Sequence, residues 1–351
     1  MIEALRDGVW ASNLVLMKPN DAIEENGSKV LMRYPATANS NAGIALVVLS
    51  AVSFGAMPIL AKLAYEQMDF AQASEVKTLL AIRFCLAAVC MWLLWAWQRR
   101  TGRAEPVLLR PAMLIPLVAM GALGYVGQSF SYFTAIGIIS ASTTGLLLYT
   151  YPMLVTLMAW LFYREALTPR KLAALALATL GALMVLGMLG PLLGFGGSSL
   201  GVIDPVGAAW GIAAAVIYSV YIIAGTRFAA GVPPIFTSTI IISSAAVVYT
   251  VWGTLSGELR LDIGWEVWLL ATAIAVICTV IAIVTFFAGL KLVGPSRAAI
   301  ASTFEPAVTV FLAPLILQER ITPEQIVGGA LVLLSVMVLQ WHTRPQVQES
   351  I

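Results

Sequence analysis

The feature that most constrains this chain is a succession of about ten apolar runs, each long enough to cross a lipid bilayer as a helix. They lie near residues 42–65, 76–98, 112–136, 139–162, 170–190, 205–226, 234–255, 265–290, 296–317 and 324–341. A bilayer core of about 30 Å requires about 20 apolar residues per helical span. Of the 351 residues, 60% are hydrophobic and 11% are charged, whereas a soluble domain has about 25% charged residues. The sequence therefore predicts an all-α membrane protein with about ten transmembrane helices.

The distribution of basic residues predicts how these helices are oriented. If the N-terminus is cytoplasmic, most of the 20 Lys and Arg residues fall in cytoplasmic loops and tails. Only Lys62, Lys77, Arg260 and Arg320 fall on the other side, and Arg83 lies within a span. Cytoplasmic loops of membrane proteins carry an excess of Lys and Arg. We therefore expect cytoplasmic N- and C-termini, an even number of spans, and a location in the bacterial inner (plasma) membrane.

An internal repeat divides the chain into two halves. Two sets of residues recur at identical spacings: Tyr151-Pro152, Glu165 and Thr168-Pro169, then Glu305-Pro306, Glu319 and Thr322-Pro323. Residues 123–185 thus repeat as 277–339. Each half holds about five spans, and an odd number places the second half upside down in the membrane. Inverted repeats are typical of secondary transporters, whose substrate site lies near the bilayer midplane between the repeats. A duplicated helix hairpin without a transport role is the alternative.

These boundaries predict the domain organisation. We expect a cytoplasmic N-terminal tail at 1–41, a first repeat at 42–190, a second repeat at 205–341 and a C-terminal tail at 342–351. Within the first tail, residues 2–17 either form a short interfacial helix or are disordered.

The repeated pattern Pro-(apolar)-Glu-x-x-Thr-Pro, followed by a helix rich in Gly and Ala, resembles the EamA domain of the drug/metabolite transporter superfamily. Ser53-Phe54-Gly55-Ala56 is similar to the opening helix of that domain, and Arg83-Phe84 is similar to its second-helix arginine. The resemblance covers roughly residues 42–341. It implies ten helices, a central cavity lined by helices 1, 3, 4, 6, 8 and 9, and alternating access by rocking of the halves. Members include YddG-like exporters of amino acids and other metabolites, some of them driven by protons.

Glu305 is the sharpest candidate for a functional side chain. It lies deep within the span 296–317, near the bilayer midplane. A charged carboxylate there costs on the order of 2.5–3.5 kcal/mol on insertion scales, so Glu305 should face a polar cavity or carry a proton. We therefore expect it to bind substrate and to couple transport to protons. A glutamate that only anchors the bend at Pro306 is the alternative.

Polar and aromatic residues in other spans form the candidate lining of the cavity. Tyr125, Gln128 and Tyr132 fall on one face of the span 112–136. Tyr151 is the repeat partner of Glu305, which suggests opposite walls of one cavity. The remaining candidates are Ser53, Tyr218 and Tyr221. Buried hydroxyl and amide groups need hydrogen-bond partners, and either a substrate or a neighbouring helix can supply them.

Pro152 and Pro306 are candidate hinges. Each removes the backbone hydrogen bond to the residue four positions earlier. The freed carbonyl groups can face the cavity, although an ordinary kink is equally open.

The two Thr-Pro pairs predict helix starts. Thr168 and Thr322 fit as N-caps, with proline at the first helical position. We expect Glu165 and Glu319 to organise these turns.

Other classes of function lack the residues they need. The sequence has no G-x-x-x-x-G-K-[ST] motif, so it carries no ATPase of that kind and indicates no cofactor. The single histidine, His342, lies in the C-terminal tail, which excludes a His-based metal site or proton relay within the membrane. A net charge of +2 gives no support for nucleic-acid binding. We therefore expect a protein that is not an enzyme.

Together these features predict a secondary transporter that exports small metabolites, with amino acids as the first candidate and protons as a candidate coupling ion. A lipid flippase and an uptake carrier for another metabolite are the alternatives. The scarcity of cations in the spans disfavours a highly anionic substrate. The expected partners are a small-molecule substrate and membrane lipid, and a monomer could suffice because the duplication supplies both halves.

Overall fold

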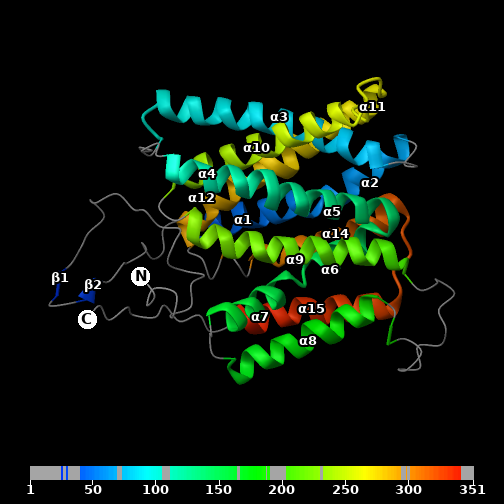
Figure 1. The fold of residues 1–351 in the computed structure, drawn as a ribbon. Coiled ribbons are helices and arrows are strands. Elements are labelled where there is room, and N and C mark those ends of the chain that lie inside the picture. The colour runs from blue at the N-terminus through cyan, green and yellow to red at the C-terminus, as the bar shows by residue number, and fades with distance from the viewer. Residues whose placement is uncertain are drawn as a thin grey trace.

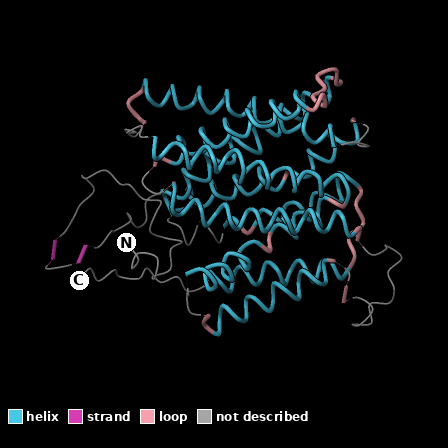
Figure 2. Tube along the Cα trace, viewed as in Figure 1, coloured by secondary structure: helices cyan, strands magenta, loops and turns pink. Residues whose placement is uncertain are grey.

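A computed structural model describes the helical body of the protein and a few residues of its N-terminal segment. The described residues are 25–26, 29–30, 40–68, 73–104, 111–163, 167–186, 188–189, 203–229, 232–293, 298 and 301–340. Nearly all of them are helical, and the helices run side by side in one bundle (Figure 1). Figure 2 shows described loops at the two ends of this bundle and a short break near its middle. The expectation for residues 2–17 falls outside the described residues.

The described residues of the first sequence half form nine helical elements and a short strand pair. The strands β1 (Glu25–Asn26) and β2 (Lys29–Val30) pair antiparallel. The helices are α1 (Ser40–Gly55), α2 (Met57–Gln67), α3 (Ala73–Arg100), α4 (Pro111–Ala119), the π-helix η2 (Met120–Tyr125), α5 (Val126–Ile138), α6 (Ala141–Leu148), α7 (Tyr151–Tyr163) and α8 (Pro169–Val185).

The second sequence half repeats much of this order. Its described helices are α9 (Pro205–Phe228), α10 (Pro234–Leu255), α11 (Trp265–Ala275), the π-helix η3 (Val276–Ile281), α12 (Ala282–Val293), α14 (Phe304–Leu317) and α15 (Pro323–Gln340). The π-helix η2 lies between α4 and α5, and η3 lies between α11 and α12. The third span of each half therefore contains a π-helical turn at a corresponding place.

The lengths of these helices confirm an all-α membrane protein. Within the part of the chain that the structure describes, six helices are long and apolar enough to cross a membrane. They are Asn41–Gln67, Glu75–Arg100, Met113–Ile138, Pro205–Gly225, Pro234–Leu255 and Trp265–Val293. The shorter segments formed by α6 with α7, by α8, by α14 and by α15 occupy the other four expected spans.

Three expected spans are interrupted where the sequence analysis drew continuous helices. Ala56 separates α1 from α2, residues 149–150 separate α6 from α7, and Thr303 separates the helical residues 301–302 from α14. A proline lies in the first turn of each second segment, at Pro58, Pro152 and Pro306. Proline has no backbone N–H and its ring collides with the carbonyl four residues earlier. Each proline therefore interrupts the helical hydrogen bonds of its span, while the backbone at Ala56 and Thr303 stays in the right-handed helical region.

The two halves interlock through helix pairs that cross from one half to the other. Helix α1 packs along α12, α5 packs along α9, α3 packs along α10, and α8 packs along α15. The last pair is visible at the lower edge of Figure 1. Gly181 and Gly328 allow α8 and α15 to approach closely, since a Cβ at Gly181 would lie 2.6 Å from the Gly328 carbonyl oxygen. Small residues at such crossings are typical of membrane helix packing.

Candidate substrate site between the halves

The interrupted spans meet one another near the middle of the bundle, where α1, α6 and α14 lie together (Figure 1). The Thr309 hydroxyl of α14 donates a hydrogen bond to the carbonyl oxygen of Gly55, the last residue of α1, at 2.8 Å. Gly55 leaves no room for a side chain, because a Cβ there would lie 2.5 Å from the Glu305 carbonyl oxygen. The break in the first span therefore sits directly against the first turn of α14, which carries Glu305.

A hydrogen bond between the halves holds the Glu305 side chain. The Tyr149 hydroxyl donates to Glu305 Oε2 at 2.8 Å, and the Ser302 carbonyl oxygen lies 3.3 Å from the same hydroxyl. Tyr149 lies at the break between α6 and α7 and is 6% exposed. Among the described residues, no Lys or Arg lies within ion-pair distance of Glu305. Among the described residues, its carboxylate therefore has a hydroxyl partner and no cationic one.

Tyr149 is the site residue that the sequence analysis missed. The repeat pointed to Tyr151 as the residue facing Glu305, and both tyrosines fall in the segment Tyr149-Thr150-Tyr151. Tyr151 does lie within electrostatic range of Glu305. The hydrogen bond nevertheless comes from Tyr149, because the helix break places this residue outside the regular helical spacing that the prediction assumed.

A row of tyrosine rings leads away from Glu305. The row comprises Tyr149, Tyr151, Tyr218, Tyr221 and Tyr125, from α6–α7, α7, α9, α9 and η2 respectively. Successive ring centroids are 5.9, 4.8, 6.0 and 5.9 Å apart. Apart from Tyr149, each of these side chains is only partly buried. The structure thus brings four of the predicted lining residues together, next to the predicted carboxylate.

The other predicted lining residues differ in their surroundings. Tyr132 is 4% exposed and lies within electrostatic range of both Glu305 and Arg83. Gln128 is buried one turn earlier on α5. Ser53 is buried in α1, and its hydroxyl donates to the Leu49 carbonyl of the same helix at 2.8 Å. Ser53 therefore has an internal hydrogen-bond partner and needs none from a substrate.

Arg83 lies in a closed environment. Its side chain is 2% exposed, so it does not extend to the membrane surface. Its Nε donates to Thr279 Oγ1 in η3 at 3.2 Å. The guanidinium also lies over the rings of Phe84 and Phe133, at 4.8 and 5.1 Å from the ring centroids. These contacts fix the arginine in place between two aromatic rings.

Each half contributes one residue to this region from its π-helix. Tyr125 ends η2, and Thr279, the partner of Arg83, lies in η3. The Thr279 hydroxyl also donates to the Ile274 carbonyl, five residues earlier, at 3.1 Å. Short π-helices inside α-helices are rare and frequently lie at functional sites. Apolar periodicity cannot reveal them, and the sequence analysis did not predict them.

A second contact between the halves closes one end of the bundle. Glu319, in the loop between α14 and α15, accepts hydrogen bonds from Ala141 N at 2.7 Å, from Ser142 N at 3.2 Å and from Ser142 Oγ at 2.9 Å. Gln325 Nε2 donates to Thr143 Oγ1 at 3.2 Å. We call these contacts the Glu319 clasp. The first backbone N–H groups of a helix lack internal partners and attract negative charge, so the carboxylate stabilises the start of α6.

The Glu319 clasp corrects one expectation. Glu319 does not organise the turn that precedes its own Thr-Pro pair. Instead Thr322 and Gln325 form a reciprocal cap there, with Gln325 N donating to Thr322 Oγ1 and Thr322 N donating to Gln325 Oε1, both at 3.1 Å. Thr168 accepts from Lys171 N and caps α8, as predicted. Glu165 lies outside the described residues.

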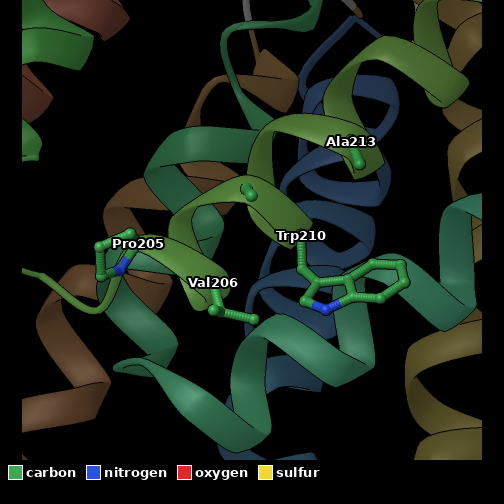
Figure 3. A pocket seen from close by; sticks show the side chains of 5 residues that line it. Pro205, Val206, Trp210 and Ala213 are labelled. Carbon is green, nitrogen blue, oxygen red and sulfur yellow. The ribbon is translucent and has the colours of Figure 1, made fainter.

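A pocket at the surface of the bundle lies elsewhere. A shallow groove of about 440 Å³ runs along one face of α9 near its start (Figure 3). Its lining consists of Pro205, Val206, Ala209, Trp210 and Ala213. Val206 is 58% exposed, which indicates that this face points away from the bundle. An apolar surface groove lacks the charged and hydroxyl groups that orient a hydrophilic substrate, so the candidate site remains at Glu305.

The fold and these contacts define a class of protein: an α-helical membrane transporter built from two related halves. The model of the EamA-like transporter family matches residues 41–187 and, a second time, residues 205–341. The chain therefore belongs to the EamA-like transporter family, and it is a transporter rather than an enzyme. This confirms the resemblance to the drug/metabolite transporter superfamily.

Two further comparisons agree with this assignment. An uncharacterized transporter of Synechocystis sp. is 25% identical over 321 residues, which cover 86% of this chain and 93% of that protein. A crystal structure of a protein that is 22% identical covers 85% of this chain and 96% of that chain, with a TM-score of 0.55. The second likeness concerns the fold alone.

Proposed function

We propose that this transporter exports small metabolites, with amino acids as the first candidate, and that the substrate binds at Glu305 and the tyrosine row. The observation that carries the proposal is the hydrogen bond from Tyr149 to Glu305, because it joins the two halves at a carboxylate inside the membrane. Transporters with inverted repeats bind substrate near the midplane, between the repeats, at interrupted helices. Glu305 and Tyr149 each lie at such an interruption.

Proton coupling is the second part of the proposal. A carboxylate within a membrane is costly unless it is paired, solvated or protonated. Glu305 has no cationic partner among the described residues, so a proton and a substrate ammonium group can compete for it. Loading of one would release the other, which is the exchange that proton-driven export requires.

The breaks before Pro152 and Pro306 suggest how the site would change access. Pro306 frees the carbonyl group of Ser302, four residues earlier, and this oxygen accepts a hydrogen bond from the Tyr149 hydroxyl of the other half at 3.3 Å. We propose that α7 and α14 pivot at these positions as the two halves rock against each other.

A counterflow assay in liposomes tests this proposal. Purified protein is reconstituted, and exchange of a panel of labelled amino acids is measured with and without a proton gradient. We expect saturable exchange that responds to the gradient in the wild type and loses this response in Glu305→Gln. Glu258→Gln, whose carboxylate lies in the loop between α10 and α11, is the matched control.

The outcomes separate the parts of the proposal. A gradient response that persists in Glu305→Gln would remove Glu305 from the coupling role. Exchange of no amino acid by well-folded protein would overturn the substrate assignment. Accumulation rather than release in right-side-out vesicles would replace export with uptake.

A further inference from the structure

We infer that this site recognises the ammonium group of its substrate, so that organic amines are transported whether or not they also carry a carboxylate. The inference rests on the proposed function and adds the chemical class of the substrate. Its basis is the Glu305 carboxylate, which has no ion-pair partner among the described residues and lies beside several tyrosine rings. The described residues of the site offer no cationic group that would bind an anion in the same way.

The carboxylate supplies the charge that a cation needs. Glu305 accepts a hydrogen bond from Tyr149 on Oε2, while no described Lys or Arg neutralises it. Hydrogen bonds to a charged carboxylate are stronger than those between neutral groups, and an ammonium group has three donors. A substrate ammonium would therefore bind Glu305 more strongly than any neutral group could.

The tyrosines favour the same kind of ligand. Tyr132, Tyr149, Tyr151 and Tyr218 all lie within electrostatic range of Glu305. The rings of Tyr149 and Tyr151, and those of Tyr151 and Tyr218, meet edge-to-face. The face of an aromatic ring is negative, and cations bind within about 6 Å of its centre. Glu305 and the ring faces therefore favour the same charge.

The neighbouring cations are already engaged and do not form an equivalent site for a substrate carboxylate. Arg83 is enclosed by Phe84 and Phe133, with its Nε bonded to Thr279. Lys62 donates to the Ile136 carbonyl at 2.9 Å and to the Ile139 carbonyl at 3.3 Å, at the end of α5. A substrate carboxylate would meet only neutral hydroxyl and amide groups in the described site. It can be accommodated there, but it contributes less to binding than the ammonium.

A set of matched competitors tests the inference in the reconstituted full-length protein. Counterflow of a labelled aromatic amino acid is measured against four unlabelled compounds: the same amino acid, its decarboxylated amine, the N-trimethylated form of that amine, and the deaminated carboxylic acid. The trimethylated form keeps its charge at every pH and has no N–H donor. We expect the amino acid and both cations to compete at similar concentrations, and the carboxylic acid not to compete.

Variants distinguish ring contacts from hydrogen bonds. Tyr218→Phe keeps the ring and removes the hydroxyl, whereas Tyr218→Leu removes both. Because cation–π contacts are worth about 0.5–2 kcal/mol, Tyr218→Leu should weaken competition by the trimethylated amine about 2- to 30-fold, with little change in Tyr218→Phe. Glu305→Gln should weaken the binding of the amino acid and of both cations alike, and Glu258→Gln should leave their competition unchanged.

The results separate this inference from the proposed function. If the amino acid is exchanged and the carboxylic acid competes while the two amines do not, the inference is wrong and amino acid transport stands. If Tyr218→Phe and Tyr218→Leu lose competition equally, the ring contact is wrong. If neither the amino acid nor the amines exchange in folded protein, the proposed transport itself fails.

Discussion

At the residue scale, the hydrogen bond between Tyr149 and Glu305 gives the first prediction. Tyr149→Phe keeps the ring contact with Tyr151 and removes the donor to Glu305. The loss of a hydrogen bond to a charged group costs about 1.5–3 kcal/mol, so we expect a lower melting temperature in detergent and slower exchange in liposomes. Tyr151→Phe is the matched control, because no hydrogen bond of its hydroxyl is described. Equal effects of the two substitutions would contradict the assigned role of Tyr149.

The ion pair between Lys77 and Glu258 gives a prediction about pH. It joins α3 to the loop after α10, and Lys77 Nζ also lies 4.5 Å from the ring centroid of Trp252. Hydrogen bonds from Lys77 and Ser256 hold the pKa of Glu258 below its usual value. A lowered folded-state pKa gives stability that is present above the unfolded value of about 4.3 and is lost as the pH falls through the folded value.

The measurement is thermal unfolding of the wild type and of Glu258→Gln across this range. We expect the difference in melting temperature to stay constant between about pH 5 and pH 8 and to shrink below about pH 4. Asp262→Asn serves as the control, because the side chain of Asp262 is 76% exposed and its contact with Arg260 is long, at 3.7 Å. A difference that grows on acidification would show that another group controls the effect.

The residues of the candidate site were predictable to different degrees. Glu305 could be found because a carboxylate deep in an apolar run is costly and therefore conspicuous. Tyr151, Tyr218 and Tyr221 could be found as polar groups in spans, but spacing alone did not show that their rings form a row. Tyr149 could not be selected, because its orientation depends on a helix break whose position only the packed structure reveals.

At the element scale, the Glu319 clasp gives the third prediction. Glu319→Gln keeps one acceptor oxygen but loses the charge that interacts with the start of α6. Loss of an N-terminal cap costs about 0.5–2 kcal/mol, so we expect a lower melting temperature with unchanged helix content by circular dichroism. Asp262→Asn is again a suitable control, since its carboxylate caps no described helix. An unchanged melting temperature in Glu319→Gln would contradict a stabilising role for the clasp.

The elements show where reasoning from apolar runs succeeds and where it fails. The ends of the long spans were predictable, since α9 and α10 begin and end close to the expected 205–226 and 234–255. The interruption at Ala56 was not predicted, although Pro58 was a signal for it. The π-helices were not predictable either, because one extra residue per turn over such a short stretch leaves the apolar pattern nearly unchanged.

At the scale of the whole molecule, the internal repeat accounts for how the helices pair. Helix α1 packs on α12 and α9 packs on α5, and an exchange of the two halves converts one pair into the other. The sequence repeat at 123–185 and 277–339 predicted two equivalent halves, and the family match in two segments agrees with it. The contacts between the halves could not be predicted, because a repeat specifies equivalence and does not specify contact.

Movement between the halves gives the last prediction. The Glu319 clasp ties the loop after α14 to the start of α6, across the halves, so alternating access requires it to open. In a background with Cys85, Cys90 and Cys278 replaced, a cleavable crosslink between Ser142→Cys and Glu319→Cys should stop counterflow, and reduction should restore it. A crosslink between Lys62→Cys and Ile139→Cys, which lie within one half and touch through the Ile139 carbonyl, should leave exchange intact. Because rigid halves tolerate internal crosslinks and not crosslinks between them, full exchange with a complete Ser142–Glu319 crosslink would mean that the clasp stays closed throughout transport.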